Sequence, residues 1–187
     1  MKIIFLDFDG VISTAEQSWK LDKEKLDLLK NILDKTNSKI VVTSSWKRVF
    51  KDKDSFIESL KNNHRFTCID TSKYEWFIDS IIDITNGSAS WRGDEVKEWL
   101  DNNEIENYVI LDDDTDFLDE QLFNFVQTDT YEGLTSREVK LCISILNGEK
   151  ILNPIRLNSV LGFRWRLKYS IDKGEDIDRL LLKYRSL

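Results

Sequence analysis

Two carboxylates follow the first apolar run of this sequence at a spacing that suits one shared ligand. Ile3–Leu6 is an unbroken apolar stretch that predicts a buried strand, and Asp7, Asp9 and Gly10 come just after it. Residues two apart on an extended chain point the same way, so Asp7 and Asp9 can converge where Gly10 lets the chain turn. Uncompensated carboxylates repel each other, and a bound cation relieves that repulsion. An acidic turn after an edge strand is the alternative, and these residues alone leave both interpretations open.

A second apolar run also leads directly into acids. Tyr108–Leu111 predicts another strand, and Asp112 and Asp113 follow it at once. In a parallel α/β sheet, ligands bind at the carboxyl ends of the strands, so both acidic motifs would meet at one edge. Carboxylate oxygens are the ligands that Mg²⁺ selects. One shared cation site is therefore favoured over two unrelated acidic loops.

Hydroxyl and basic side chains lie between the two acidic motifs. The β-branched run Lys39–Trp46 predicts a strand that ends in hydroxyls, with Thr43 and Ser44 among them. A hydroxyl-rich turn is the alternative for this pair. A predicted helix with acids in its first turn carries Arg92 at its entrance and Lys97 further along. Taken singly, each basic residue is most often a solvated side chain.

The periodicity of the other apolar residues predicts an alternating α/β chain. A helix follows Asp22, its expected cap, and the strand–helix–strand unit around it implies a right-handed crossover between parallel strands. Residues 66–69 and 77–84 both look extended, and one of them should be the third strand while the other adds a hairpin or an edge. Phe125–Thr128 predicts a fifth strand, and Thr135–Glu138 is a capping-box sequence that opens a last helix.

Composition indicates an acidic globular protein. Hydrophobic residues make up 41% of the 187 residues and charged residues 33%, which suits one well-buried domain. Residues 1–150 carry 19 Lys and Arg against 30 Asp and Glu, whereas residues 151–187 carry 8 against 4. The resulting net charges, −11 and +4, argue against a general nucleic-acid coat and distinguish the last segment from the rest.

The sequence predicts a cytoplasmic protein without a membrane partner. Asp7 interrupts the N-terminal apolar run too early for a signal peptide, and no apolar stretch approaches the thickness of a bilayer. Cys68 and Cys142 form no metal-binding spacing and are expected to be reduced. The single histidine, His64, argues against a histidine-based triad or zinc site. The oligomeric state stays open.

The first acidic motif, Asp7-Phe8-Asp9-Gly10-Val11, resembles the first motif of the haloacid dehalogenase (HAD) superfamily, Asp-x-Asp-Gly-Thr/Val after a strand. Asp112-Asp113 resembles the fourth motif of that superfamily. The hydroxyl and basic signals between them resemble the second and third motifs. All four therefore occur in order, and the resemblance covers about residues 1–148.

Within the resemblance, the two middle motifs each leave a choice. Thr43 is the second motif, a hydroxyl that holds a phosphoryl oxygen, and Ser44 is the alternative if the strand end is off by one. The third motif is a Lys or Arg near a helix start. Arg92 is favoured, because a residue at the helix entrance can lean over the strand ends, and Lys97 is the second choice.

The resemblance implies an α/β fold, a Rossmann-like three-layer α/β/α sandwich with a mainly parallel five-stranded sheet and a minimal cap. It also implies a Mg²⁺-dependent phosphatase that acts through an aspartyl-phosphate, with Asp7 as nucleophile and Asp9 as general acid and base. Mg²⁺ would be bound by Asp7, the backbone carbonyl of Asp9 and Asp112, with Asp113 in or near the shell. The residues that would contact the substrate are Thr43, Ser44, Gly10 and either Arg92 or Lys97.

A small phosphorylated molecule is the expected substrate, and two other functions remain as alternatives. The motif run resembles small bacterial and phage HAD domains, some of them fused to RNA-repair modules, which suggests a nucleic-acid 3′-end phosphatase. Trp19, Trp46 and Trp91 could then stack on bases, although packing around the site is favoured for them. A non-catalytic HAD-like binding module is the other alternative, and the complete motif set argues against it.

Residues 149–187 form a C-terminal basic extension beyond the resemblance. Residues 163–169 alternate apolar and basic side chains, the pattern of a strand with one cationic face, and a helix follows Gly174. We expect the extension to pack on the acidic domain. The alternative is that Arg164, Arg166 and Lys168 form a ledge for a polyanion.

Overall fold

The computed structural model describes residues 1–50, 52–62, 71–87 and 91–149. Some expectations concern residues outside these ranges. They are the extended segment at 66–69, the roles of His64 and Cys68, and nearly all of the basic extension.

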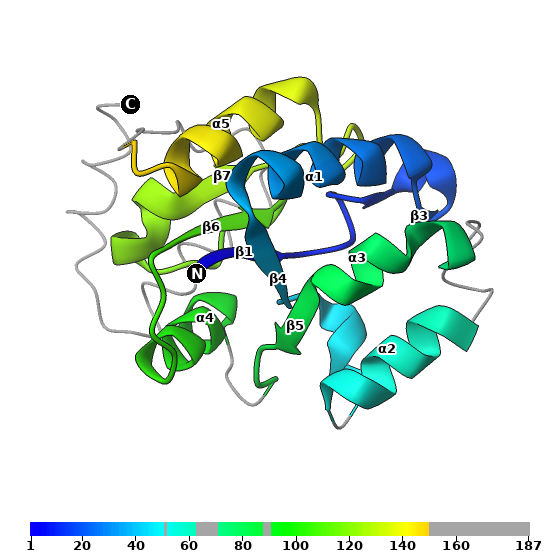
Figure 1. The fold of residues 1–187 in the computed structure, drawn as a ribbon, viewed down its shortest axis with the longest axis horizontal. Helices are drawn as coiled ribbons and strands as arrows, with labels where there is room; N and C mark the ends of the chain where they lie inside the picture. The colour runs from blue at the N-terminus through cyan, green and yellow to red at the C-terminus, as the bar shows by residue number, and fades with distance from the viewer. Residues whose placement is uncertain (51, 63–70, 88–90, 150–187) are drawn as a thin grey trace.

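Five parallel strands form the central sheet, in the order β5-β4-β1-β6-β7 (Figure 1). The strands are β1 (Lys2–Leu6), β4 (Ser38–Val42), β5 (Ile81–Ile84), β6 (Asn107–Asp112) and β7 (Phe125–Gln127). The α-helices are α1 (Lys23–Thr36), α2 (Lys53–Asn62), α3 (Glu75–Ser80), α4 (Arg92–Asp101) and α5 (Ser136–Leu146). Short 3₁₀ helices are η1 (Ala15–Gln17), η2 (Ser45–Val49), η3 (Thr71–Tyr74) and η4 (Asp119–Asn124).

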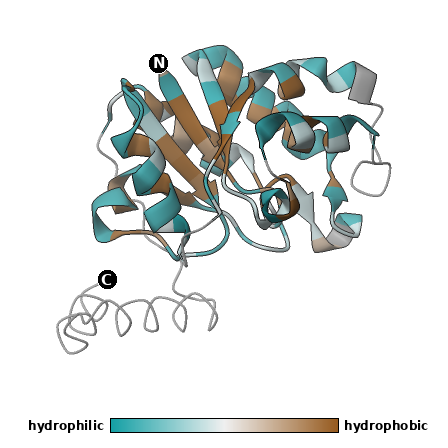
Figure 2. Ribbon diagram, turned by 90° about the horizontal axis from the view of Figure 1, so that it is seen from below, coloured by the Kyte–Doolittle hydropathy of each residue, from teal (hydrophilic) through white to brown (hydrophobic). Residues whose placement is uncertain are grey.

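Helices cover both faces of the sheet because its strands are apolar on both sides. Ile4 and Leu6 of β1 pack in one cluster with side chains of α1, α2, α3 and α5. Ile3 and Phe5 point the other way, into a second cluster with side chains of α4. Figure 2 shows the apolar strands lying between helices with hydrophilic outer surfaces. The expected three-layer α/β/α fold is confirmed.

Local sequence signals set the ends of the helices in the layer of α1 and α5. The side chain of Asp22 accepts a hydrogen bond from the amide of Glu24 at 2.8 Å and caps α1, as expected. Asn37 ends that helix in the left-handed region, with φ of 52°. The capping box between Thr135 and Glu138 opens α5, also as expected.

The expectation of one extended segment over residues 77–84 is wrong in its first half. Residues up to Ser80 belong to α3, and only β5 is extended. Tyr74, Phe77, Ile78 and Ile81 are all buried and recur at the i, i+3, i+4, i+7 spacing of a helix. The apolar face that they form holds α3 against the core.

The strand expected at Lys39–Trp46 also ends earlier, at Val42, and the chain then turns into η2. The amide of Thr43 still donates to the carbonyl of Leu6 at 2.9 Å, which keeps Thr43 at the edge of the sheet. The hydroxyl of Ser44 accepts from the amide of Trp46 at 3.4 Å and caps η2.

The direction of strand addition reverses between β1 and β6. From β1 the chain adds β4 and then β5 on one side, and it returns through α4 to add β6 and β7 on the other. This reversal is the point where open α/β sheets bind ligands. A two-stranded flap, β2 (Ser13–Thr14) with β3 (Lys20–Leu21), follows β1 directly at this end.

None of the helices in the described ranges is long and apolar enough to cross a membrane.

Candidate active site

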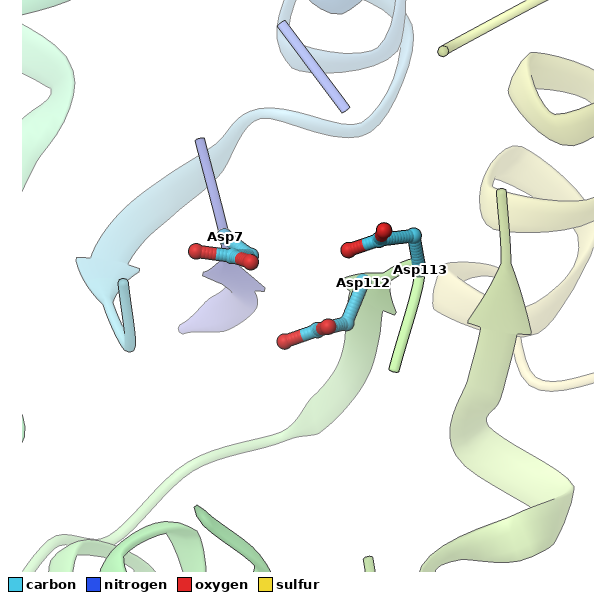
Figure 3. Close-up of side chains that lie close together, drawn as sticks. All are labelled: Asp7, Asp112 and Asp113. Carbon is cyan, nitrogen blue, oxygen red and sulfur yellow. The ribbon is translucent and has the colours of Figure 1, made fainter. Parts of the chain in front are cut away.

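The point where the strand order reverses brings the two acidic motifs together. Leu6 pairs with Leu111 in the parallel register, so the next residue, Asp7, lies beside Asp112 at the end of β6. One carboxylate oxygen from each of Asp7, Asp112 and Asp113 lies within 4.8 Å of the other two. Figure 3 shows these three side chains close together at the strand ends. Asp7 is 3% exposed and Asp112 fully buried, so their charges are largely removed from water.

Three buried polar atoms in this region have no hydrogen-bond partner among the described residues. They are Oδ1 of Asp7, the hydroxyl oxygen of Thr43 and Oδ1 of Asp116, which lies 3.8 Å from Nε of Arg92. Buried polar atoms nearly always have a partner, so those of Asp7 and Thr43 mark places that a ligand can fill. Three clustered carboxylates with one unsatisfied oxygen fit a hard divalent cation such as Mg²⁺, which prefers oxygen ligands.

The guanidinium of Arg92 contacts the acids of this cluster and those just beyond it. Its Nη1 donates to Oδ2 of Asp7 at 2.8 Å and to Oδ2 of Asp112. Its Nη2 donates to Oδ2 of Asp114 at 3.1 Å, and its Nε lies 3.8 Å from Oδ1 of Asp116. This guanidinium therefore links the acids at the ends of β1 and β6 and partly neutralises their charge.

A glycine allows α4 to carry Arg92 this close to the sheet. A Cβ added to Gly93 would lie 2.7 Å from the amide nitrogen of Leu118 and 2.9 Å from Cα of Phe117. The amide of Gly93 donates to the carbonyl of Asp116 at 3.0 Å. The first turn of α4 thus rests directly on the backbone that follows β6.

The other candidate base, Lys97, points elsewhere. Its Nζ pairs with Asp101 at 3.2 Å and with Glu120 at 3.9 Å, and its side chain is 49% exposed. Of the two choices that the sequence left open, the structure brings Arg92 to the acids and leaves Lys97 at the surface.

Burial and repulsion from neighbouring carboxylates raise the pKa of Asp112 and Asp113. Burial raises the pKa of Asp112 well above its usual value, although Arg92 opposes the change. Burial also raises the pKa of Asp113, to about 6, while the hydroxyl of Thr130 lowers it by donating to its Oδ2. Burial alone would lower the pKa of Arg92. The surrounding carboxylates, with Asp112 and Asp7 foremost, together outweigh burial and raise this pKa well above its usual value. A bound cation would favour the ionised form of these carboxyls.

Asp9 lies beside the cluster but not in it. Its Oδ2 accepts from the indole Nε1 of Trp46 at 2.8 Å, and its Oδ1 accepts from the hydroxyl of Ser13 at 3.2 Å. Burial raises the pKa of Asp9, and the bond from Trp46 opposes that rise. The side chains that gather around a common point are therefore those of Asp7, Asp112 and Asp113, as the structure describes them.

Gly10 leaves space for one of these acids. It has a φ of +70°, and an added Cβ would lie 2.3 Å from Cγ of Asp113. Its own amide donates to the carbonyl of Ser13 at 2.7 Å, inside the turn after β1. Gly10 was expected to contact the substrate. Its missing side chain also leaves room for Asp113, so the first and fourth motifs can approach each other here.

Comparison with known protein families adds the observation that decides the family. The model of the family described as "HAD domain in Swiss Army Knife RNA repair proteins" matches residues 3–139, which include both acidic motifs, Thr43 and Arg92. The chain belongs to this family. Neither the curated proteins nor the solved structures gave a match.

A buried ion pair ties three parts of the HAD domain together behind the acids. Nζ of Lys47 lies 2.7 Å from Oε2 of Glu95, and the two side chains are 2% and 1% exposed. The hydroxyl of Thr85 donates to the same oxygen at 2.9 Å. Lys47 lies in η2, Thr85 follows β5, and Glu95 lies one turn along α4 from Arg92. The pair therefore fixes the start of α4 relative to the ends of β4 and β5.

The contacts of Trp46 with Asp9 and of Lys47 with Glu95 were not predicted from the sequence. From the sequence, Trp46 was expected to pack around the site or to stack on a base, and Lys47 was given no role. Their contacts follow from the early end of β4, which the β-branched run in the sequence does not indicate. A strand that ends at Val42 turns the next residues back across the edge of the sheet, towards Asp9 on one side and Glu95 on the other.

Proposed function

We propose that this HAD domain is a Mg²⁺-dependent phosphatase that hydrolyses phosphomonoesters through an aspartyl-phosphate on Asp7. The observation that carries the proposal is the cluster of Asp7, Asp112 and Asp113, with its unsatisfied buried oxygen. A family member with this cluster at the strand ends has both the ligands for a cation and a carboxylate beside it that can attack phosphorus.

The binding step is supported by the positions of the cluster and of two polar groups. Asp7, Asp112 and Asp113 would hold Mg²⁺, which reduces the repulsion between the attacking carboxylate and the phosphate. The unpartnered hydroxyl of Thr43 would donate to one phosphoryl oxygen. Arg92, already hydrogen-bonded to Asp7, would stabilise negative charge on another.

The chemical steps divide between the two acids of the first motif. A carboxylate oxygen of Asp7 forms a bond to phosphorus as the bond to the leaving oxygen breaks, and Asp9 gives a proton to that oxygen. In the second step Asp9 takes a proton from water, the water oxygen bonds to phosphorus, and Asp7 is released. The two acids suit different roles, because Asp7 contacts the cation Arg92 whereas Asp9 is held by neutral donors.

A substrate screen tests the proposal. Sugar phosphates, nucleotides and an aryl phosphate are incubated with the protein and Mg²⁺, and released phosphate is measured with and without a chelator. We expect turnover that stops with the chelator and returns with added Mg²⁺. Chelator-resistant turnover would indicate different chemistry, and no turnover on any substrate would favour the non-catalytic binding module.

The description of the matched family supports a second candidate, a phosphatase for 3′-phosphorylated nucleic-acid ends. The flap after β1 carries Trp19, whose side chain is 45% exposed and thus accessible to a base. Adding a 3′-phosphorylated oligonucleotide to the screen separates the candidates. A kcat/KM for the oligonucleotide well above that for a mononucleotide would favour the second.

A further inference from the structure

The contact between Trp46 and Asp9 joins two of the motifs, and the chemistry of its donor is one-directional. An indole N–H can donate a hydrogen bond and cannot accept one. Oδ2 of Asp9, 2.8 Å from this donor, is therefore held as an acceptor. A bond of this length to a carboxylate is of the strong, charge-assisted kind.

Besides its bond to Asp9, Trp46 makes a ring contact and a backbone contact. Its ring meets the ring of Phe8, the residue before Asp9, edge-on at a centroid distance of 5.3 Å. The backbone amide of Trp46 donates to the hydroxyl of Ser44, the residue after Thr43. Trp46 is thus held both by the loop after β1 that carries Asp9 and by the loop that carries Thr43.

The other oxygen of Asp9 has a partner of a different kind. Oδ1 is 3.2 Å from the hydroxyl of Ser13, a buried group that can donate or accept. When the carboxyl carries a proton on Oδ1, that hydroxyl can turn to accept instead of donate. Asp9 therefore has one oxygen that tolerates a proton and one that does not.

We propose that Trp46 is a positioning residue, which holds Oδ2 of Asp9 as an acceptor and so makes Oδ1 the oxygen that exchanges protons. This role depends on the proposed phosphatase function. In the first step, Oδ1 of Asp9 gives its proton to the leaving oxygen. The bond between that oxygen and phosphorus breaks as a bond between Asp7 and phosphorus forms. In the second, Oδ1 takes a proton from the attacking water as the bond to Asp7 breaks.

The test compares two substrates with different needs for a proton donor. An alkyl phosphate has a poor leaving group and needs general acid catalysis, whereas p-nitrophenyl phosphate does not. Trp46→Phe keeps the ring and removes the N–H. We expect kcat on the alkyl phosphate to fall by about 10- to 100-fold, the worth of a hydrogen bond to a charged group. On the aryl phosphate we expect a fall of less than about threefold, since little proton donation is needed. KM should change little for either substrate.

Trp99→Phe is the matched control. Nε1 of Trp99, in α4, donates to Oδ2 of Asp83, in β5, at 2.7 Å. The change therefore removes the same type of hydrogen bond, but one that does not involve Asp9. We expect it to leave the ratio of the alkyl and aryl rates unchanged. A second control uses Asp9→Asn, which removes the proton donor. In that background Trp46→Phe should cause no further loss on the alkyl phosphate.

Three kinetic results would overturn the role of Trp46. They are an equal loss on both substrates, no loss on either, and a full additional loss in the Asp9→Asn background. If Trp46→Phe does not fold, NMR of the indole N–H signals decides instead. The Trp46 signal should move on Asp9→Asn and the Trp99 signal should not. A Trp46 signal that stays in place would overturn the inference.

The same measurements separate this inference from the proposed function. A wild-type protein that hydrolyses neither substrate with Mg²⁺ present would end the phosphatase proposal and the catalytic role of Trp46 with it. A wild-type protein that is active while Trp46→Phe keeps the same substrate ratio would end the inference alone.

Discussion

Arg92 contacts more acids of the site than any other cation that the described residues show. It reaches Asp7 and Asp112 with one nitrogen and Asp114 with another, and its side chain is only 14% exposed. A guanidinium suits this place, because it stays charged and presents several donors in one plane. It is also close enough to Asp7, the proposed nucleophile, to contact a phosphoryl group that binds there.

Replacing the two candidate bases in turn should give very different results. We expect Arg92→Ala to lower kcat/KM by about 100-fold or more, because a donor to the transition-state charge is lost from a water-poor site. Lys97→Ala should stay within about twofold, since its ion pairs are exposed and worth little. Steady-state kinetics on one phosphomonoester checks both. The assignment of Arg92 is contradicted if the two variants lose similar activity.

The acids of this site could be predicted from sequence because their positions follow from backbone geometry alone. Asp7 directly follows β1, Asp112 ends β6, and the parallel pairing of these two strands places the acids side by side. The partners of Trp46 and Lys47 could not be predicted in this way. They depend on how a non-repetitive loop turns after β4, and on contacts with residues distant in the sequence.

At the scale of elements, helices and strands were predicted correctly where the sequence has one clear apolar periodicity. The prediction was wrong where a helical and a strand-like pattern overlap. The face of α1 and the capping box of α5 were predicted, because each has one strong signal. Residues 77–84 contain a continuous apolar stretch that fits a strand, together with a helical spacing that begins at Tyr74. The first half of this stretch belongs to α3, because a helix lets Phe77 and Ile78 pack together against the core on the α1 side of the sheet.

The Lys47–Glu95 pair is the clearest structural connection between elements, and its energetics are testable. Glu95→Ala would leave the buried charge of Lys47 without compensation, so we expect it to lower the free energy of unfolding by about 3–5 kcal/mol. Replacing both residues, as in Lys47→Met with Glu95→Leu, should recover most of that loss. Urea denaturation measures both effects.

Lys97→Ala also serves as the control for this experiment. Its pair with Asp101 is of the same chemical type but about half exposed, so we expect a change below about 1 kcal/mol. Equal stability of the Glu95→Ala variant and the wild type would show that the buried pair does not hold α4 in place.

At the scale of the whole molecule, the acidic domain and the basic extension have opposite charges. Residues 1–150 have a net charge of −11 and residues 151–187 one of +4. The sequence predicts that the extension packs on the domain, and nearly all of it lies outside the described residues. An overall acidic protein gains little long-range attraction for phosphate chains, which is why packing is favoured over a polyanion ledge.

Removing the alternating charges of the extension tests that preference. We expect the triple variant Arg164→Ala, Arg166→Ala, Lys168→Ala to lose thermal stability and to keep any affinity for oligonucleotides. Thermal unfolding and oligonucleotide titrations at two salt concentrations make the comparison. A variant that is equally stable but loses a steeply salt-dependent affinity would favour the ledge instead.

We propose that Asp7 attacks phosphorus while Mg²⁺ is bound beside it. This role of Asp7 is tested most directly by measuring phosphate release from one phosphomonoester by the wild type and Asp7→Asn, each with Mg²⁺ and with a chelator. Asn is similar in size to Asp and lacks the nucleophilic carboxylate, so the fold should persist, as circular dichroism can verify. We predict turnover only for the wild type with Mg²⁺. Near-normal turnover by folded Asp7→Asn would contradict the proposed mechanism.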